Sequence, residues 1–408
     1  IQGTTTTETF NNVIINKSAG TLTTAGSVAT LNVNDLTLSA GTFNSPATFN
    51  INGDYTLDAG TWVPSTNTYL YGDLINNGST ITVGSSTVRL SSTSATQTIG
   101  GAATTTLYNL VLNNTSGTTP QIEVTNTLQV NNTLTFTSGV VDLNGTTLTI
   151  GSSAASRGSI GGTPSTTSYL GNGSVRRWFT NLTIPNNNSS GLFPVGDIDF
   201  NGYSPLYLSM PATAPTGGGS VTASYTGSAT NTNVSFLDGA TPIQVRTDAG
   251  WTLSTAAGLT GGTYNLNAGR AFCAICVGSV NDLRLVLTSG VVGTAGTNSG
   301  TTTFPYAQRT GLSLANLSNT FFIGSTSSSN SPLPVELGDF KGAVNKGKVE
   351  LTFTTYSETN NDYFTIDRST DGIIWEHIAT VDGSGNSNNL RQYATEDAHP
   401  VPGNALYR

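Results

Sequence analysis

Residues 197–202 carry the side chains whose spacing best suits a metal ion. Their sequence is D-x-D-x-N-G, in which Asp197, Asp199 and Asn201 place three oxygen-bearing side chains at alternate positions. Oxygen ligands suit calcium, and the following glycine allows the chain to bend around an ion. The twelfth position is Leu208, however, where a helix-loop-helix calcium site has a bidentate glutamate. The alternative interpretation is an ordinary turn in which aspartate accepts hydrogen bonds from backbone amides.

Cys273 and Cys276 are the two cysteines of the chain, and their C-x-x-C spacing occurs in redox and zinc sites. A thioredoxin-like site requires the start of a helix in a βαβ unit, and a zinc site requires a second pair of ligands. The surrounding sequence has neither context. We therefore expect a local disulfide, as in exported proteins, or two buried thiols.

Arg176, Arg177 and Trp178 form a basic and aromatic cluster, which is a candidate contact for an acidic glycan. In a strand, alternation directs Arg176 and Trp178 to one face and Arg177 to the other. The alternative is an arginine stem packed over an aromatic ring for stability alone.

Side chains for enzymatic chemistry are scarce. Hydrolysis needs an acid and base pair, an activated nucleophile or a metal. His377 and His399 are the only histidines, and no H-E-x-x-H or G-x-S-x-G motif accompanies them. The first 167 residues contain three basic side chains, which are Lys17, Arg89 and Arg157. We expect no catalytic residue and no enzymatic activity.

The composition of the 408 residues favours strands over helices. Only 9% of the residues are charged, against about 25% in ordinary soluble domains, and 47 are glycine. Thr and aromatic residues favour strands and Asn and Gly favour turns, whereas long helices draw on Ala, Leu, Glu, Lys and Arg, of which the three charged types are scarce here. Because 36% of residues are apolar and the net charge is −8, disorder is not expected. We predict an all-β protein.

Residues 1–150 repeat themselves. Residues 35–43 recur nineteen positions later as residues 54–62, and a longer block recurs after about 97 residues. Apolar side chains alternate within each unit, as Leu36 and Leu38 do, which is the period of a half-buried strand. Stacked coils would form a β-solenoid about 35 Å long, at about 4.8 Å per coil. A meander of hairpins is the competing architecture.

Three aspartates share one register of this repeat, and they are Asp35, Asp54 and Asp73. A ladder of carboxylates on one face is a second candidate calcium site. The alternative is a solvated aspartate at each corner that accepts hydrogen bonds from backbone amides.

The rest of the chain divides into four segments. Residues 151–167 and 324–332 are rich in Gly, Ser and Thr and are expected to be linkers. Residues 168–323 contain longer strands between Gly, Pro and Asn clusters, which predicts a central β-sandwich. Residues 333–408 hold 11 of the 23 acidic residues and three of the four lysines, which marks them as a separate domain.

This last segment carries a sequence pattern. It contains L-P-V-E-L from Leu333, V-E-L-T-F-T-T from Val349, and S-E-T-N-N-D-Y-F-T-I-D-R-S-T-D-G from Ser357, followed by Trp375. The pattern resembles the fibronectin-III-like module that precedes the C-terminal sorting domain in many secreted Bacteroidota proteins exported by the type IX system. The resemblance implies an exported protein at the cell surface or outside the cell, and it implies no reaction.

In that family a further strand follows the one that contains Tyr407 and Arg408. The resemblance therefore implies a sandwich without its last strand, either because the sequence continues past Arg408 or because the protein is cut there. Such a sandwich has an open edge, which can accept a strand from a neighbouring chain.

We expect a secreted or cell-surface structural or adhesive protein, with an extracellular filament subunit as one form of it. The alternative is a secreted carbohydrate-binding or carbohydrate-active protein. The expected partners are a second copy of the chain, joined by strand addition at the open edge, or surface glycans. No cofactor is expected, with calcium as the candidate ion. The acidic balance argues against nucleic acid, and no apolar run is long enough to span a membrane.

Overall fold

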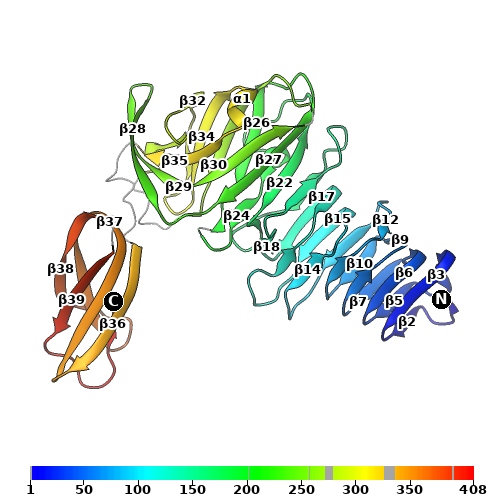
Figure 1. The fold of residues 1–408 in the computed structure, drawn as a ribbon, viewed down its shortest axis with the longest axis horizontal. Helices are drawn as coiled ribbons and strands as arrows, with labels where there is room; N and C mark the ends of the chain where they lie inside the picture. Colours follow the sequence, from blue (N-terminus) through cyan, green and yellow to red (C-terminus); the bar gives the residue numbers. More distant parts are fainter. Residues whose placement is uncertain (1, 201, 257, 272–278, 326–335, 388–389) are drawn as a thin grey trace.

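The computed structural model describes all residues except 1, 201, 257, 272–278, 326–335 and 388–389 (Figure 1). About 60% of the chain is strand and 3% is helix, which confirms the prediction of an all-β protein. The N-terminal part is a β-solenoid of about 8 turns, and antiparallel sheets follow it. Among the described residues, no helix is both long and apolar enough to cross a membrane.

Two parallel sheets run along the solenoid, and each coil contributes a strand to each sheet. The first sheet consists of β2 (Thr7–Phe10), β5 (Thr30–Val33), β7 (Thr48–Ile51), β10 (Asn67–Leu70), β13 (Thr87–Leu90), β15 (Thr105–Asn113), β17 (Leu128–Ser138), β19 (Thr147–Ile150) and β22 (Ser174–Phe179). The second consists of β3 (Val13–Leu22), β6 (Leu36–Asn44), β8 (Tyr55–Leu57), β11 (Leu74–Asn76), β14 (Gln97–Gly100), β16 (Ile122–Val124), β18 (Val141–Asp142), β21 (Leu170–Gly171) and β24 (Val195–Asp197).

Shorter strands complete the coils. The end of β6 pairs in parallel with β9 (Thr61–Val63), and β9 pairs with β12 (Thr80–Ile81). At the N-terminal end, β1 (Gln2–Gly3) pairs with β4 (Ala25–Gly26). All of these pairs are parallel, whereas a meander of hairpins would have produced antiparallel pairs.

The 19-residue repeat sets the stacking of the first coils. Leu36 pairs with Tyr55, and Tyr55 pairs with Leu74, so equivalent residues of successive coils lie side by side. All three side chains are buried in the interior of the solenoid. The predicted alternation is confirmed here, because the polar neighbours of these residues face outward.

Residues 151–167 differ from the expectation of a linker. They contain β20 (Ser159–Gly162), which pairs in parallel with the second half of β17. Ile160 of this strand packs against the solenoid core. The composition was misleading because a short coil needs only one or two inward apolar side chains to join the stack.

The solenoid passes into the central sandwich without a break in pairing. After β22, the first sheet continues antiparallel through β27 (Gly219–Thr226), β29 (Thr241–Ala256), β35 (Thr320–Ser325) and β31 (Leu283–Val286), and β28 (Asn231–Asp238) also pairs with β29. A separate antiparallel sheet contains β23 (Leu192–Phe193), β26 (Leu206–Thr213), β30 (Thr263–Gly269), β34 (Pro305–Leu312), β32 (Thr294–Ala295) and β33 (Ser299–Gly300). One hydrophobic core extends from Ile15 in the solenoid to Ile323 in the sandwich.

A few short elements complete this body. They are β25 (Gly202–Tyr203), which pairs with β24, the 3-10 turns at Ser189–Gly191 and Val280–Asp282, and α1 (Leu314–Leu317). Of the predicted linker at 324–332, Gly324 and Ser325 belong to β35, and the remainder lies outside the described residues.

The C-terminal module has two small sheets around the long strand β37 (Lys348–Ser369). The first half of β37 pairs with β36 (Glu336–Asn345) and β39 (Arg391–Asp397), and the second half pairs with β38 (Glu376–Ser387) and β40 (Leu406–Tyr407). All four pairings are antiparallel. The module has its own core, which is built on Leu351, Phe353 and Ile366.

Candidate functional site

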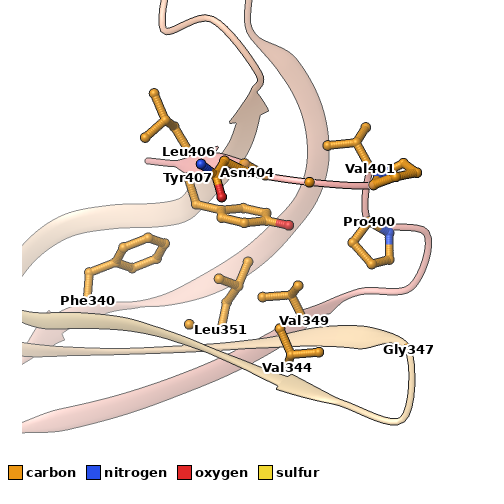
Figure 2. A pocket seen from close by; sticks show the side chains of 14 residues that line it. Phe340, Val344, Gly347, Val349, Leu351, Pro400, Val401, Asn404, Leu406 and Tyr407 are labelled. Atoms are coloured by element: carbon orange, nitrogen blue, oxygen red, sulfur yellow. The ribbon is translucent and has the colours of Figure 1, made fainter.

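A groove of about 850 Å³ opens along one side of the C-terminal module (Figure 2). One wall is the hairpin of β36 and β37, which contributes Val344, Val349 and Leu351. The other wall is the chain from residue 400 to residue 407, which ends in β40. The groove therefore separates the edges of the two sheets.

The hairpin has the local sequence that its geometry requires. Asn345 pairs with Lys348, so only Lys346 and Gly347 form the turn, with φ of 51° and 82°. Two-residue turns with both φ values positive match the twist of antiparallel strands, and glycine accepts this conformation readily. The tight turn keeps Val344 directly beside Val349, so both side chains line the groove.

The side chains of the groove are mainly apolar, and several of them are exposed. Leu351 at the floor is fully buried, whereas Val344 is 80% exposed and Leu406 is 53% exposed. Phe340, further along β36, is 40% exposed. Because contiguous exposed apolar side chains mark interaction surfaces, this groove is a candidate binding site.

The strand β40 forms one edge of the groove, and among the described residues it pairs with β37 alone. Arg408 and Asp367 exchange both backbone hydrogen bonds, at 3.0 and 3.1 Å. Because alternate residues of an antiparallel strand point their backbone groups to opposite sides, the N–H and C=O of Tyr407 point away from β37. Unpaired groups of this kind are a template for an added strand.

A buried polar network anchors this edge. The Tyr407 hydroxyl donates to Asp397 Oδ2 at 2.9 Å, and Arg368 Nη1 donates to the same oxygen at 2.7 Å. Arg368 also forms an ion pair with Glu376 at 2.7 Å and donates to the carbonyl of His399. Burial alone would raise the pKa of Asp397, but the hydrogen bonds from Tyr407, Arg368 and the His399 amide together hold it below its ordinary value.

A second buried carboxylate lies where β37 passes from one sheet to the other. Glu358 is 1% exposed and accepts hydrogen bonds from Thr355 Oγ1 at 2.7 Å, the Asn361 amide group at 2.8 Å, the Ser384 backbone N–H at 2.8 Å and the Tyr393 hydroxyl. Burial raises the pKa of Glu358, and these four donors outweigh it and lower the pKa. The sequence contained no signal for this cluster, because its donors come from three strands.

Residues 197–200 of the predicted calcium motif form a turn, which was the alternative interpretation. Asp197 Oδ1 accepts hydrogen bonds from the backbone N–H groups of Asp199 and Phe200, at 3.0 and 2.9 Å, and Oδ2 accepts one from Gly227 at 2.8 Å. Asn201 lies outside the described residues. Within the described part of the chain, no group of three His, Cys, Asp or Glu side chains is arranged to hold a metal. Calcium binding remains a prediction.

The aspartate ladder also bonds to backbone amides. Asp35 Oδ1 accepts the Asp54 N–H at 2.9 Å, Asp54 Oδ1 accepts the Asp73 N–H at 2.9 Å, and Asp73 Oδ1 accepts the Thr98 N–H at 2.7 Å. Each carboxylate therefore joins its coil to the next one. Burial raises the pKa of Asp73, the Thr98 hydrogen bond partly offsets this, and the neighbouring Asp54 raises it further.

The residues of the predicted basic and aromatic cluster lie on the two faces of β22. Arg176 is exposed and Trp178 half-buried on the outer face of β22, and Arg177 is buried on the inner face, as the alternation predicted. Cys273 and Cys276 lie outside the described residues.

Comparisons of the chain with protein-family profiles, curated proteins and solved structures found no match.

Proposed function

We propose that this protein is a non-enzymatic structural or adhesive scaffold outside the cell, in which the C-terminal module binds an added β-strand. The carrying observation is that the unpaired edge of β40 borders the apolar groove of the same module. An added strand would pair with the backbone of Tyr407 and place alternate side chains in the groove. The resemblance of residues 333–408 to modules of secreted surface proteins supports the extracellular location.

We further propose that the added strand comes from a second copy of the chain, which would make a homopolymer. The solenoid and the sandwich share one core, which suits a stiff spacer between successive modules. Stacked parallel strands make such a spacer about 38 Å long over eight steps of about 4.8 Å.

Sedimentation velocity at increasing protein concentration, with electron microscopy of the same samples, tests this proposal. Val344→Lys and Leu406→Lys place charges at the exposed rim of the groove. Because both side chains already contact solvent, neither substitution buries a charge in the core of the module. We expect both variants to reduce association at least tenfold. Ile373→Lys is the matched control, since Ile373 is 82% exposed in the same module but does not line the groove. A wild-type protein that stays monomeric at all concentrations would contradict self-assembly.

A further inference from the structure

A second groove lies on the solenoid, where the stacking of its strands is interrupted. It has a volume of about 480 Å³ and is lined by Tyr108 of β15, Asn131 and Asn132 of β17, Val83, Ser152 and residues 155–159. This volume lies in the range of about 300–1,000 Å³ that is usual for small-molecule sites. Its lining is mainly polar, unlike that of the groove in the C-terminal module.

A β-bulge builds one side of this groove. Leu107 of β15 pairs with Val130 of β17, but Asn109 pairs with Thr133, so both Asn131 and Asn132 lie opposite the single residue Tyr108. A bulge leaves one residue outside the regular pairing and redirects its side chain, and bulges are frequent beside functional sites.

The next coil builds the other side. Its strand β19 pairs with the first part of β17 and β20 with the second part, and residues 151–158 leave the stack between them. Gly151 and Gly158 stand at the two ends of this loop, with φ of 88° and 67°. A Cβ atom on Gly151 would lie 2.2 Å from the carbonyl oxygen of Arg157, so the loop closes tightly on itself. Backbone geometry therefore keeps this loop compact at the side of the groove.

Hydrogen bonds orient the two asparagines and leave one polar group of each available. Gln129 Nε2 donates to Asn131 Oδ1 at 2.6 Å, which leaves the Asn131 NH₂ group without a partner in the described part of the chain. Asn132 Nδ2 donates to Asn109 Oδ1 at 2.8 Å, which leaves Asn132 Oδ1 as an acceptor. The groove thus offers one fixed donor and one fixed acceptor, the pair that a sugar hydroxyl requires.

Arg157 adds a charge to the groove. Its guanidinium makes no hydrogen bond or ion pair with any residue that the structure describes, and no acidic side chain lines the groove. Burial, and secondarily the charge of Arg157, lower the pKa of the nearby Arg177 to about 10. An anion bound by Arg157 would relieve the repulsion between the two cations.

We propose that this groove binds a sugar residue that carries a carboxylate or a sulfate group. Arg157 contacts the anionic group, Asn131 and Asn132 contact hydroxyls, and the Tyr108 ring packs against the apolar face of the sugar. The proposal is independent of strand addition at the C-terminal module. It differs from the glycan contact expected at Arg176, because Arg176 instead bonds to Thr222 Oγ1 at 3.4 Å on an open sheet face.

Isothermal titration calorimetry of the whole protein tests this site with three trisaccharides: a trigalacturonate, a sulfated galactan trisaccharide and neutral maltotriose. We expect at least one anionic sugar to bind at least tenfold more tightly than maltotriose. Binding of only the carboxylate or only the sulfate form identifies which group the site takes. Failure of both to bind, or equal binding of all three sugars, overturns the proposal.

Matched variants locate the binding. Arg157→Gln and Tyr108→Ala should each lower the affinity for the anionic sugar at least tenfold. Arg157→Lys should retain part of this affinity because it keeps the positive charge. Arg176→Gln, which removes one exposed arginine elsewhere on the same sheet, should bind like the wild type. Equal losses in Arg157→Gln and Arg176→Gln would show non-specific charge attraction and overturn the proposal. Val344→Lys should bind the sugar normally, which separates this test from that of self-assembly.

Discussion

At the residue scale, several carboxylates of this charge-poor chain act as hydrogen-bond acceptors within the fold. The Asp35, Asp54 and Asp73 ladder and Asp197 all accept backbone amides. A carboxylate that accepts backbone N–H groups satisfies donors that would otherwise be unpaired at the corners of the coils. The same residue types that suggested metal sites therefore have a structural role.

Asp54→Ala should lower the free energy of unfolding by about 1 kcal/mol, because it leaves the Asp73 amide without its acceptor. Asp54→Asn keeps an oxygen at this position and should cost less. Urea denaturation followed by circular dichroism measures both. A chelator should leave the melting temperature of the wild type unchanged. If the chelator lowers the melting temperature of the wild type but not that of Asp54→Ala, the aspartate ladder binds calcium instead.

Asp397→Asn should destabilise the C-terminal module by about 3 kcal/mol at pH 7, because it removes the buried partner of Arg368 and Tyr407. Glu376→Gln is the control, since Glu376 contacts the same arginine but its side chain is 69% exposed, and we expect a loss below about 1 kcal/mol. Hydrogen exchange of peptides from β37 and β38 reports on the module separately. Equal losses of stability in Asp397→Asn and Glu376→Gln would contradict the expectation that the buried ion pair contributes more than the exposed one.

At the element scale, each coil depends on a small number of inward side chains. Phe43, Phe49, Tyr55 and Trp62 form a chain of edge-to-face aromatic contacts, with ring centroids 5.3, 6.1 and 4.8 Å apart in turn. These rings come from β6, β7, β8 and β9, so they join successive strands and coils. Aromatic pairs in this geometry stabilise a core beyond their buried area.

Trp62→Ala should therefore cost about 3–5 kcal/mol, because it opens a cavity among these rings and removes the hydrogen bond to Ser45. Tyr71→Ala, at a side chain that is 39% exposed on the same solenoid, should cost far less. Hydrogen exchange of peptides from residues 36–63 provides the measurement. If residues 36–63 exchange hydrogen as slowly in Trp62→Ala as in the wild type, the contacts among these aromatic rings do not stabilise the stacking of the coils.

At the scale of the whole molecule, acid should affect the two parts of the chain differently. Asp397 and Glu358 have lowered pKa values in the folded module, so their stabilisation is present above their ordinary pKa of about 4 and is lost as the pH falls toward the folded values. The raised pKa of Asp73 has the opposite sign, so protonation of this group on acidification favours the folded solenoid.

Differential scanning calorimetry at pH 7 and pH 3.5 should therefore show the transition of the C-terminal module moving to lower temperature, while that of the solenoid and sandwich moves less. Asp397→Asn should reduce the shift of the module. A larger shift of the solenoid transition would contradict this assignment of the carboxylates.

The sequence by itself determined the local structure of this protein. Alternating apolar residues and the 19-residue repeat predicted strands such as β6 and β8 and their stacking. A strand's buried face follows from its own residues, and a repeat of constant length brings equivalent residues together. It also indicated the separate C-terminal module through its charge. The prediction of a linker at residues 151–167 was wrong, because their composition did not reveal that β20 pairs with β17.

Only the tertiary structure decided the candidate sites. Tyr108, Asn131 and Arg157 lie on three successive coils, and they share a groove because a bulge and a loop interrupt the stacking there. Likewise, Val344 and Leu406 line one groove although they lie 62 positions apart in the sequence. A strand's pattern specifies which face is buried, but pairing between distant strands, and the places where pairing stops, determine which exposed groups come together.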